Sequence, residues 1–402
     1  MELNISEQNS PQEPQEPQEP QEPQIKSGYI SKKIYNKKNK TLKFTLTNIN
    51  VSIANAIRRV ILMNIPTVVF KTFPHSENLA NFITNTTRLN NEVLKQRLAC
   101  IPIHISDLTM PINELEVEIN VKNDTKSTIF VTTEHFKIRN ISSDKYLDDD
   151  TVNKIFPPDD ITNDFIIFVR LRPPISNEIP GEEINITSKL TISTSKYSSC
   201  YNVCSACAYS FTPDKTKQDD EWQKHLPKVD DSIKKSGEIE LYQQNWYNHT
   251  AKRFFRKNSF DFIIESIGIF NCIELIQKSC DIINDKLHSI KELAKVNNLK
   301  IEKSISTIPN SFDITLENES YTIGKVLEFL IHEHYFKNKK LISYIGFRQN
   351  HPHDSFSIIR IAFNENIEGV EDTDMFKIKI NQIIEEICHI GEEIFKTIKI
   401  EF

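Results

Sequence analysis

The sequence predicts an α+β fold in which one strand–turn–helix unit occurs twice and a β-rich domain interrupts the first copy. Residues 312–331 align with residues 42–61 without a gap, which indicates a duplication. Each copy is followed by a further strand and then by a long helix with a heptad pattern of apolar residues. Many more residues separate these parts in the first copy than in the second, which indicates the insertion.

Residues 1–26 are predicted to form a disordered tail. The stretch 11–24 repeats the triplet Pro-Gln-Glu, so every third residue lacks a backbone N–H and no apolar side chain is available for burial. We expect this tail to act as a spacer rather than as a folded element.

The first unit is predicted to comprise residues 27–108 and 254–300. Leu42, Phe44 and Leu46 alternate with polar residues, as in a half-buried strand. An apolar stripe with helical spacing then begins at Ile53, and the hydroxyl of Ser52 is expected to cap this helix. The unit closes with a strand at 258–264 and a long helix. The apolar seam of that helix is expected at Ile273, Ile276, Cys280, Ile283, Leu287 and Ile290.

Residues 109–253 are predicted to form the inserted β-rich domain. Strand-like runs occur at 115–121, 129–133, 165–171 and 184–192, with acidic or proline-bearing stretches between them. The last part, 212–248, is highly charged, and we expect it to be mostly loop.

The second unit is predicted at residues 305–402 and follows the order of the first. A strand at 312–316 precedes a helix whose expected cap, Thr322, stands where Ser52 stands in the first copy. A strand at 355–359 and a C-terminal helix close the unit. The seam of this helix is expected at Phe376, Ile380, Ile383, Ile387, Ile390 and Ile394. Because both units carry such a seam, the two long helices are expected to pack on each other.

Composition excludes several classes of function. With 38% hydrophobic and 26% charged residues and a net charge of −6, the chain lacks the overall basic character of a general nucleic-acid binder, although a local basic patch stays open. The eight glycines are too scattered for a Gly-rich phosphate loop. Seven cysteines, an odd number, favour a reducing compartment. No apolar run is long enough to span a membrane, and no catalytic constellation stands out.

Five segments carry a family resemblance. Residues 50–70, NVSIANAIRRVILMNIPTVVF, resemble the N-A-L-R-R helix of the α-type subunits of RNA polymerase. Residues 85–103, NTTRLNNEVLKQRLACIPI, are similar to the N-T-S-x-L-x-D-E-x-L-x-x-R-L-x-x-I-P segment, and residues 260–270, FDFIIESIGIF, to the F-x-F-x-V-E-S-x-G strand. Residues 321–324, YTIG, and 344–352, YIGFRQNHP, resemble H-T-L-G and A-G-Y-R-x-x-H-P in the eleventh subunit of eukaryotic polymerase II and the archaeal L subunit.

The resemblance implies a fusion of the third-largest and eleventh subunits, an arrangement similar to that of large nucleocytoplasmic DNA viruses. It implies two α-like dimerisation domains, packed pseudo-symmetrically through their helices, that form the assembly platform for the β-like and β′-like large subunits and bind small subunits. Catalytic residues, cofactors and membrane contacts are not expected, and DNA is expected only indirectly. The implied location is nucleocytoplasmic or, for a viral source, the virion and host cytoplasm. Tyr321, Lys325 and Asn91 depart from the family pattern.

Arg58 and Arg59 are the most informative polar pair. They flank the apolar stripe, so at least one is expected to reach outward, and their counterparts in the second copy are Glu328 and Phe329. A platform with two different faces can distinguish two large partners. With the family motifs and the two seams, the expected interface residues are Asn55, Arg58, Arg59, Arg97, Glu265, Ile276, Ile283, Leu287, Ile383 and Ile387.

A competing hypothesis rests on Cys200, Cys204 and Cys207, whose spacing would allow three thiolates to hold zinc, with Cys100 or His104 as a fourth ligand. The chain would then be a zinc-dependent β-module that binds nucleic acid, with the repeated units as support. A structural zinc site usually has two close pairs of ligands, so we expect no metal here.

Overall fold

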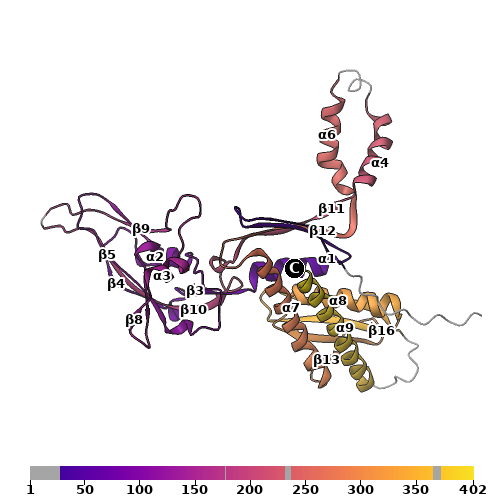
Figure 1. The fold of residues 1–402 in the computed structure, drawn as a ribbon. Helices are drawn as coiled ribbons and strands as arrows, with labels where there is room; N and C mark the ends of the chain where they lie inside the picture. Colours follow the sequence, from indigo (N-terminus) through magenta and orange to yellow (C-terminus); the bar gives the residue numbers. More distant parts are fainter. Residues whose placement is uncertain (1–27, 177, 231–236, 365–372) are drawn as a thin grey trace, which may run out of the picture.

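The computed structural model of the chain describes residues 28–402, except 177, 231–236 and 365–372 (Figure 1). The tail expected at 1–26 lies outside these residues. Helices and antiparallel sheets are mixed along the chain, so the predicted α+β class is confirmed.

Each repeated unit contains a four-stranded antiparallel sheet. In the first, the order is β1 (Ile30–Asn36), β2 (Thr41–Thr47), β12 (Phe255–Ser266) and β11 (Cys204–Pro213). In the second, it is β13 (Lys300–Lys303), β14 (Ser311–Glu317), β16 (Phe356–Phe363) and β15 (Ile342–Arg348). β2 and β14, the strands of the duplicated stretch, both lie inside their sheets because each pairs with strands on both sides.

Four helices lie against these sheets and share one hydrophobic core with both of them (Figure 1). They are α1 (Val51–Met63), α7 (Cys272–Lys295), α8 (Tyr321–Ile331) and α9 (Thr373–Glu401). α8 continues into a π-helical turn, His332–Asn338. Gly324 of α8 lies under the ring of Phe347, where a Cβ atom would be 1.9 Å from the ring, so this contact between helix and sheet requires glycine.

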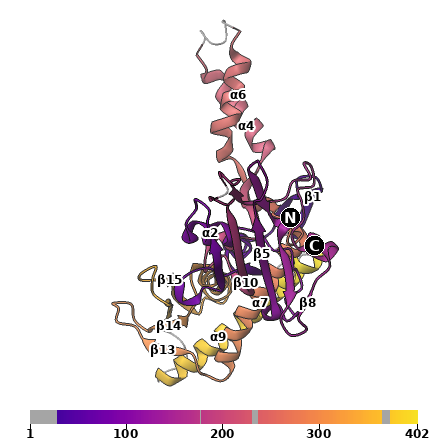
Figure 2. The ribbon, with the colours of Figure 1, turned by 90° about the vertical axis from the view of Figure 1, so that its left-hand side faces the viewer.

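The β-rich module is built on a six-stranded sheet and lies to one side of the two units (Figures 1 and 2). Its strands are β3 (Pro66–Phe70), β4 (Ala80–Asn85), β5 (Leu115–Lys122), β7 (Lys137–Asn140), β8 (Lys145–Tyr146) and β10 (Glu183–Thr194). A separate pair consists of β6 (Ile129–Thr132) and β9 (Ile167–Leu171), and the helices are α2 (Asn91–Ala99) and α3 (Asp149–Ile155). The module has its own hydrophobic core.

The limits of this module differ from those expected. β3, β4 and α2 belong to the module because β3 and β4 pair with β10, whereas the sequence assigned residues 66–105 to the first unit. Conversely, β11 pairs with β12 in the first sheet, although its residues fall within the predicted insertion. The reason is that a strand belongs to the sheet that satisfies its hydrogen bonds, and long-range pairing is not visible in local periodicity.

The predicted helix caps are also wrong. α1 is capped by Asn50, whose side chain accepts a hydrogen bond from the N–H of Ser52, and Ser320 occupies the cap position of α8. Both helices therefore start earlier than the apolar stripe indicates. The hydroxyl of Thr322 is used instead in a contact with α1 that is described below.

A two-helix arm projects from the end of β11 and β12, where mostly loop was expected (Figure 1). It consists of α4 (Lys215–His225) and α6 (Ile239–His249). Trp222, Trp246 and Ala251 form a small buried cluster in the arm, separate from the two large cores. The mostly polar sequences of both helices hide this short apolar contact from sequence periodicity.

Both tryptophans of the chain lie in this arm, so tryptophan fluorescence reports on the arm alone. Because only three of the arm's described residues form its buried cluster, we expect the arm to unfold before the platform. The urea midpoint followed by tryptophan fluorescence should lie at least about 1 M below the midpoint followed by far-UV circular dichroism. Coincident transitions would contradict an independently unfolding arm.

Candidate functional site

Arg58 and Arg59 lie on the half-buried side of α1. The opposite face of the helix is fully buried in the shared core. Arg58 donates from Nε and Nη2 to Oδ1 of Asn55, at 3.0 and 2.9 Å. Arg59 donates from Nε to Oγ1 of Thr322, at 2.9 Å, and thereby joins the first unit to α8 of the second. Of the pair, Arg59 thus makes a contact between the units that the sequence did not predict.

An open hollow of about 570 Å³ lies beside Arg59 at the junction of the two units. The first unit and the β10–β11 connection contribute Arg59, Met63 and Lys196. The second unit contributes residues 318–321 and the β15–β16 connection, including Pro352 and Asp354. Tyr321 is 45% exposed at the edge of this hollow and packs edge-on against Phe347. Sequence analysis identified the arginine but had no signal for the hollow, because its walls come from four distant segments.

Nine of the twelve predicted seam residues are buried in the shared core, and they include the five that were also expected at the interface, namely Ile276, Ile283, Leu287, Ile383 and Ile387. Ile273, Ile390 and Ile394 are only partly buried against this core. The two helices run antiparallel, since Asp281 pairs with Lys399 and Lys291 pairs with Glu392. The seam therefore joins the two units of this chain to each other.

Lys291 and Glu392 form a largely buried ion pair within that seam. Their side chains are 12% and 6% exposed, and Nζ lies 2.5 Å from Oε2. His288 contributes a second nitrogen 3.4 Å from the other carboxylate oxygen. A largely buried carboxylate therefore links α7 to α9.

Arg97 and Glu265 lie apart from the Arg58–Arg59 pair. Arg97 donates to the carbonyl oxygen of Ile167, at 3.0 Å, within the β-rich module. Glu265 is exposed on β12. No contact in the described part of the chain joins either side chain to Arg58 or Arg59, so the predicted set does not form one continuous site.

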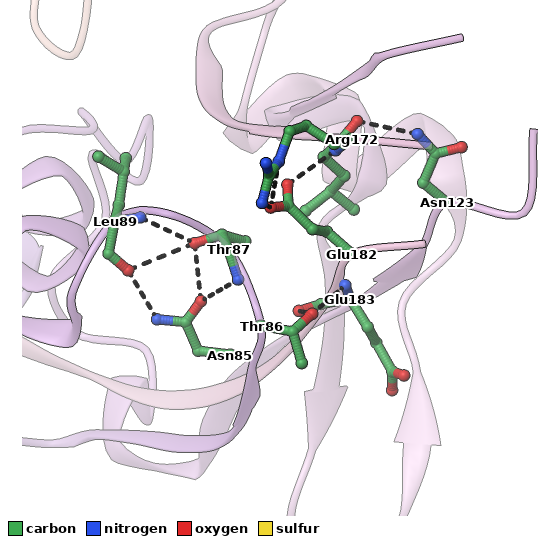
Figure 3. A network of polar contacts seen from close by, with 9 residues as sticks. Asn85, Thr86, Thr87, Leu89, Asn123, Arg172, Glu182 and Glu183 are labelled. Carbon is green, nitrogen blue, oxygen red and sulfur yellow. Dashed lines mark hydrogen bonds and ion pairs between the residues drawn. The ribbon is translucent and has the colours of Figure 1, made fainter. Parts of the chain in front are cut away.

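The segment 85–91, which carries part of the family resemblance, forms a closed network of polar contacts (Figure 3). Asn85 donates to the carbonyl oxygen of Leu89, at 2.9 Å, and accepts hydrogen bonds from the N–H and hydroxyl of Thr87. Thr86 accepts from the N–H of Glu183, at 2.7 Å, which ties the loop to the start of β10. These residues therefore shape a loop rather than present reactive groups.

Arg172 and Glu182 form an ion pair beside this loop, and the sequence analysis did not identify it. The Arg172 side chain and backbone N–H both donate to the carboxylate of Glu182, which is 7% exposed (Figure 3). Asn123, which is fully buried, donates to the carbonyl oxygens of Leu171 and Ser127. The network holds the β9–β10 connection in place.

The three cysteines of the competing zinc hypothesis do not converge. Cys200 lies 3.1 Å from the hydroxyl of Ser198 in a small cluster near the module. Cys204 and Cys207 are buried in the shared core, and burial raises the pKa of the Cys204 thiol to about 11. Within residues 28–402, leaving out the undescribed positions, no group of three or more His, Cys, Asp and Glu side chains is arranged to hold a metal.

His104, the suggested fourth ligand, has a structural position instead. It lies where the module meets the first unit, and a Cβ atom on Gly268 would be 3.1 Å from its ring and 3.3 Å from the ammonium of Lys40. Gly268 has a φ of +111°, which also favours glycine. Burial, followed by the charge of Lys40, lowers the pKa of His104. Lys40 also pairs with Asp160 of the module, at 2.9 Å.

Among the helices that the structure describes, none combines the length and the apolar character needed to cross a membrane.

Comparison with known proteins places these features in a family. Residues 43–287 match the family described as the RNA polymerase Rpb3/Rpb11 dimerisation domain. The chain is 34% identical over 105 residues to DNA-directed RNA polymerase subunit Rpo3 of Pyrococcus furiosus, which covers 26% of this chain and 36% of that protein. It is 35% identical over 78 residues to DNA-directed RNA polymerase II subunit RPB3 of Schizosaccharomyces pombe, covering 19% and 24%.

A longer match extends over most of another relative. The chain is 23% identical over 312 residues to the subunit 3B of DNA-directed RNA polymerases IV and V of Arabidopsis thaliana, covering 64% of this chain and 89% of that protein. The first two matches, by contrast, span about a third and a quarter of their relatives. The family match covers more than half of this chain and includes most of β2, all of α1 and most of α7, which contribute the first unit's part of the shared core. The chain therefore belongs to the Rpb3/Rpb11 dimerisation-domain family, the α-like subunits of RNA polymerase.

Proposed function

We propose that this chain is the non-catalytic assembly platform of a DNA-directed RNA polymerase, on which the two large catalytic subunits associate. The observation that carries the proposal is the shared core, in which α7 and α9 pack as an antiparallel pair between two similar sheets. A single chain with both halves of such a platform needs no second copy to complete it. Covalent joining also gives each half a high effective concentration for the other.

The domain assignment belongs to this proposal. We infer a third-subunit-like part, 27–108 with 254–300, an inserted β-rich domain, 109–253, and an eleventh-subunit-like part, 305–402. The pairing of β3, β4 and β11 supports moving the limits of the insertion to about residue 66 and about residue 203. A gene fusion of this kind, as in large nucleocytoplasmic DNA viruses, would place the protein in viral transcription, in the virion and host cytoplasm. A cellular source implies a nucleocytoplasmic location.

The two halves of the proposed pseudo-symmetric platform differ where a partner would dock. Arg59 lies in the hollow between the units, whereas its counterpart Phe329 packs on the shared core. Arg58 has Glu328 as its counterpart, and Glu328 pairs with Lys325 at 2.5 Å. This difference in charge supports recognition of two different large subunits by two similar scaffolds. Small polymerase subunits would bind elsewhere on the platform, and DNA would be contacted through the complex.

Reversing the charge of both arginines tests the proposed docking face. We expect Arg58→Glu with Arg59→Glu to reduce recovery of the β-like large subunit at least about tenfold in co-purification, because a guanidinium that captures carboxylates or carbonyls is replaced by a repelling charge. Far-UV circular dichroism should remain unchanged, since both positions are only half-buried.

Two controls separate docking from the internal contact of Arg59. Thr322→Val removes the hydrogen bond to Arg59 without changing the charge of the hollow, and should leave recovery of the partner unchanged. Arg256→Glu with Lys257→Glu reverses two neighbouring exposed charges on β12 and should also have no effect. Normal recovery of the large subunit by the Arg58–Arg59 variant would contradict the assignment of this face.

A further inference from the structure

The outer face of the first sheet carries exposed apolar side chains. The inner faces of β2 and β12 pack with α1 in the shared core (Figure 1). On the outer face Ile34, Lys43 and Ile263 stand in one row across β1, β2 and β12. Ile34 is 64% exposed and Ile263 is 36% exposed, and neither belongs to a hydrophobic cluster of the described residues. We refer to these two isoleucines as the apolar strip.

Four lysines surround this strip. Lys32 and Lys43 line a shallow hollow of about 340 Å³ on the outer face, and Asp261 of β12 lines it as well. Lys37 and Lys38 follow in the turn that joins β1 to β2. All four lysines are exposed, and within the described part of the chain none of them forms an ion pair. One aspartate balances only part of their charge, so the side of the face formed by these hairpin lysines is positive.

The N-terminal segment joins the fold beside this surface. The described part of the chain begins at Gly28, just before β1. Three consecutive N–H groups, those of residues 28–30, donate to the carboxylate of Glu401 on α9, at 3.1, 3.0 and 2.9 Å. Gly28 has a φ of +109°, a conformation that lets the chain reverse its direction. The segment 1–27 is therefore attached at a fixed point, and the apolar strip begins only about 13 Å further along β1.

This segment complements the surface in composition. Residues 1–25 contain six glutamates and no lysine or arginine, so their charge is opposite to that of the hairpin lysines. The repeat in residues 11–24 supplies apolar and acidic side chains at a constant spacing of three, namely Pro11, Pro14, Pro17, Pro20 and Pro23, and Glu13, Glu16, Glu19 and Glu22. Opposite charge and attachment beside the surface identify this segment as the occupant that the face fits.

We propose that residues 11–24 dock on the outer face of the first sheet as a polyproline II helix. With three residues per turn, such a helix presents all prolines of the repeat on one side and all glutamates on another. Prolines of successive turns are about 9 Å apart. Ile34 and Ile263 are two strand spacings apart, about 10 Å, so two prolines can contact the apolar strip. Because Asp261 and Glu265 lie on β12, the glutamates face the hairpin lysines instead.

The attachment at Gly28 makes even a weak contact effective. The segment cannot leave the neighbourhood of the face, so its effective concentration there is high. In the free chain the docked segment covers the apolar strip, and any partner that binds this face has to displace it. The inference goes beyond the proposed function and does not depend on it.

Zero-length cross-linking with a carbodiimide tests this contact, because the reagent joins a glutamate to a lysine only where the two groups touch. In the purified full chain at low salt, mass spectrometry of the monomer should identify cross-links from residues 13–22 to the hairpin lysines. Their yield should exceed the yield at exposed control lysines at least about fivefold. In 1 M NaCl, where charges are screened beyond about 3 Å, the yield should fall at least about threefold. The control lysines, which form no ion pair among the described residues, are Lys126, Lys145, Lys154 and Lys303.

Two variants separate docking from attachment nearby. Ile34→Ser with Ile263→Ser removes the apolar strip but keeps every charge and the point of attachment. Changing the five prolines of the repeat to glycine keeps its charge and length but removes the preference for a polyproline II helix. Each variant should lower the yield at the hairpin lysines at least about threefold, with an unchanged far-UV circular dichroism spectrum of the folded part. An unchanged yield in either variant would overturn the proposal, because attachment alone would then explain the cross-links.

Other occupants are distinguished in the same experiment. Cross-links from the repeat to the hairpin lysines that occur only in a covalent dimer would assign the face to the N-terminal segment of a second copy and would overturn docking within one chain. Equal yields at the hairpin and control lysines would overturn docking altogether. Because these measurements use no other polymerase subunit, a failure here leaves the test of the assembly platform unaffected.

Discussion

Replacing Glu392 by alanine is expected to lower the free energy of unfolding by about 3–5 kcal/mol, because the ammonium of Lys291 would remain largely buried without its partner. Lys291 is only 12% exposed, and its nitrogen is held by Glu392 between α7 and α9. The change should be measured by urea denaturation followed by far-UV circular dichroism, which includes the long helices of the platform, whereas tryptophan fluorescence follows only the arm.

The neighbouring residue on the same helix is a matched control. Glu393 pairs with Lys396 at 3.0 Å, but both side chains are well exposed, so Glu393→Ala should change stability little. A double variant, Lys291→Met with Glu392→Leu, removes both charges and should be far more stable than Glu392→Ala. Equal effects of Glu392→Ala and Glu393→Ala would contradict a buried pair.

Replacing Leu287 by alanine is expected to destabilise the protein by about 2–5 kcal/mol, because a fully buried side chain is removed from the seam. The facing position on α9 is Gly391, and a Cβ atom there would lie 2.9 Å from Cδ1 of Leu287. Any side chain larger than that of glycine at position 391 would therefore collide with Leu287. Gly391→Ala alone should destabilise the protein despite the higher helix propensity of alanine.

The two substitutions together give a sharper result than either alone. In the Leu287→Ala background the new methyl group at position 391 meets an empty space, so the double variant should be more stable than the sum of the single effects by at least about 1 kcal/mol. If the stability changes of the two single variants simply add in the double variant, Leu287 does not contact the methyl group introduced at position 391. Leu330 also lies near Gly391, with Cδ1 3.4 Å from the added atom, and Leu330→Ala is a useful second background.

Both predictions concern the contact that holds the two repeated units together. If that contact is the basis of the platform, variants that loosen it should also lose the large subunits, even though they leave Arg58 and Arg59 unchanged. Stability and partner recovery should then fall together across this series. The Arg58–Arg59 variant should lose partner recovery alone.

The sequence determined the elements that depend on short-range periodicity. Alternation at Leu42, Phe44 and Leu46 predicted β2, and the apolar stripe from Ile53 predicted α1, because a residue's neighbours two, three or four positions away are fixed by the local backbone. The same reasoning predicted most of the buried seam of α7 and α9, although Ile273, Ile390 and Ile394 are only partly buried. The unbroken duplication then indicated that two such units share one fold.

Only the tertiary structure decided where distant segments meet. It assigned β3 and β4 to the module and β11 to the first sheet, and it separated Cys200 from Cys204 and Cys207. It also brought Arg59 to Thr322 across the two units, and it joined two polar helices into the arm. Each of these results depends on hydrogen bonds or burial between residues far apart in the chain. Such contacts leave no periodic signal in a single sequence, because their partners are set by the packing of the whole molecule.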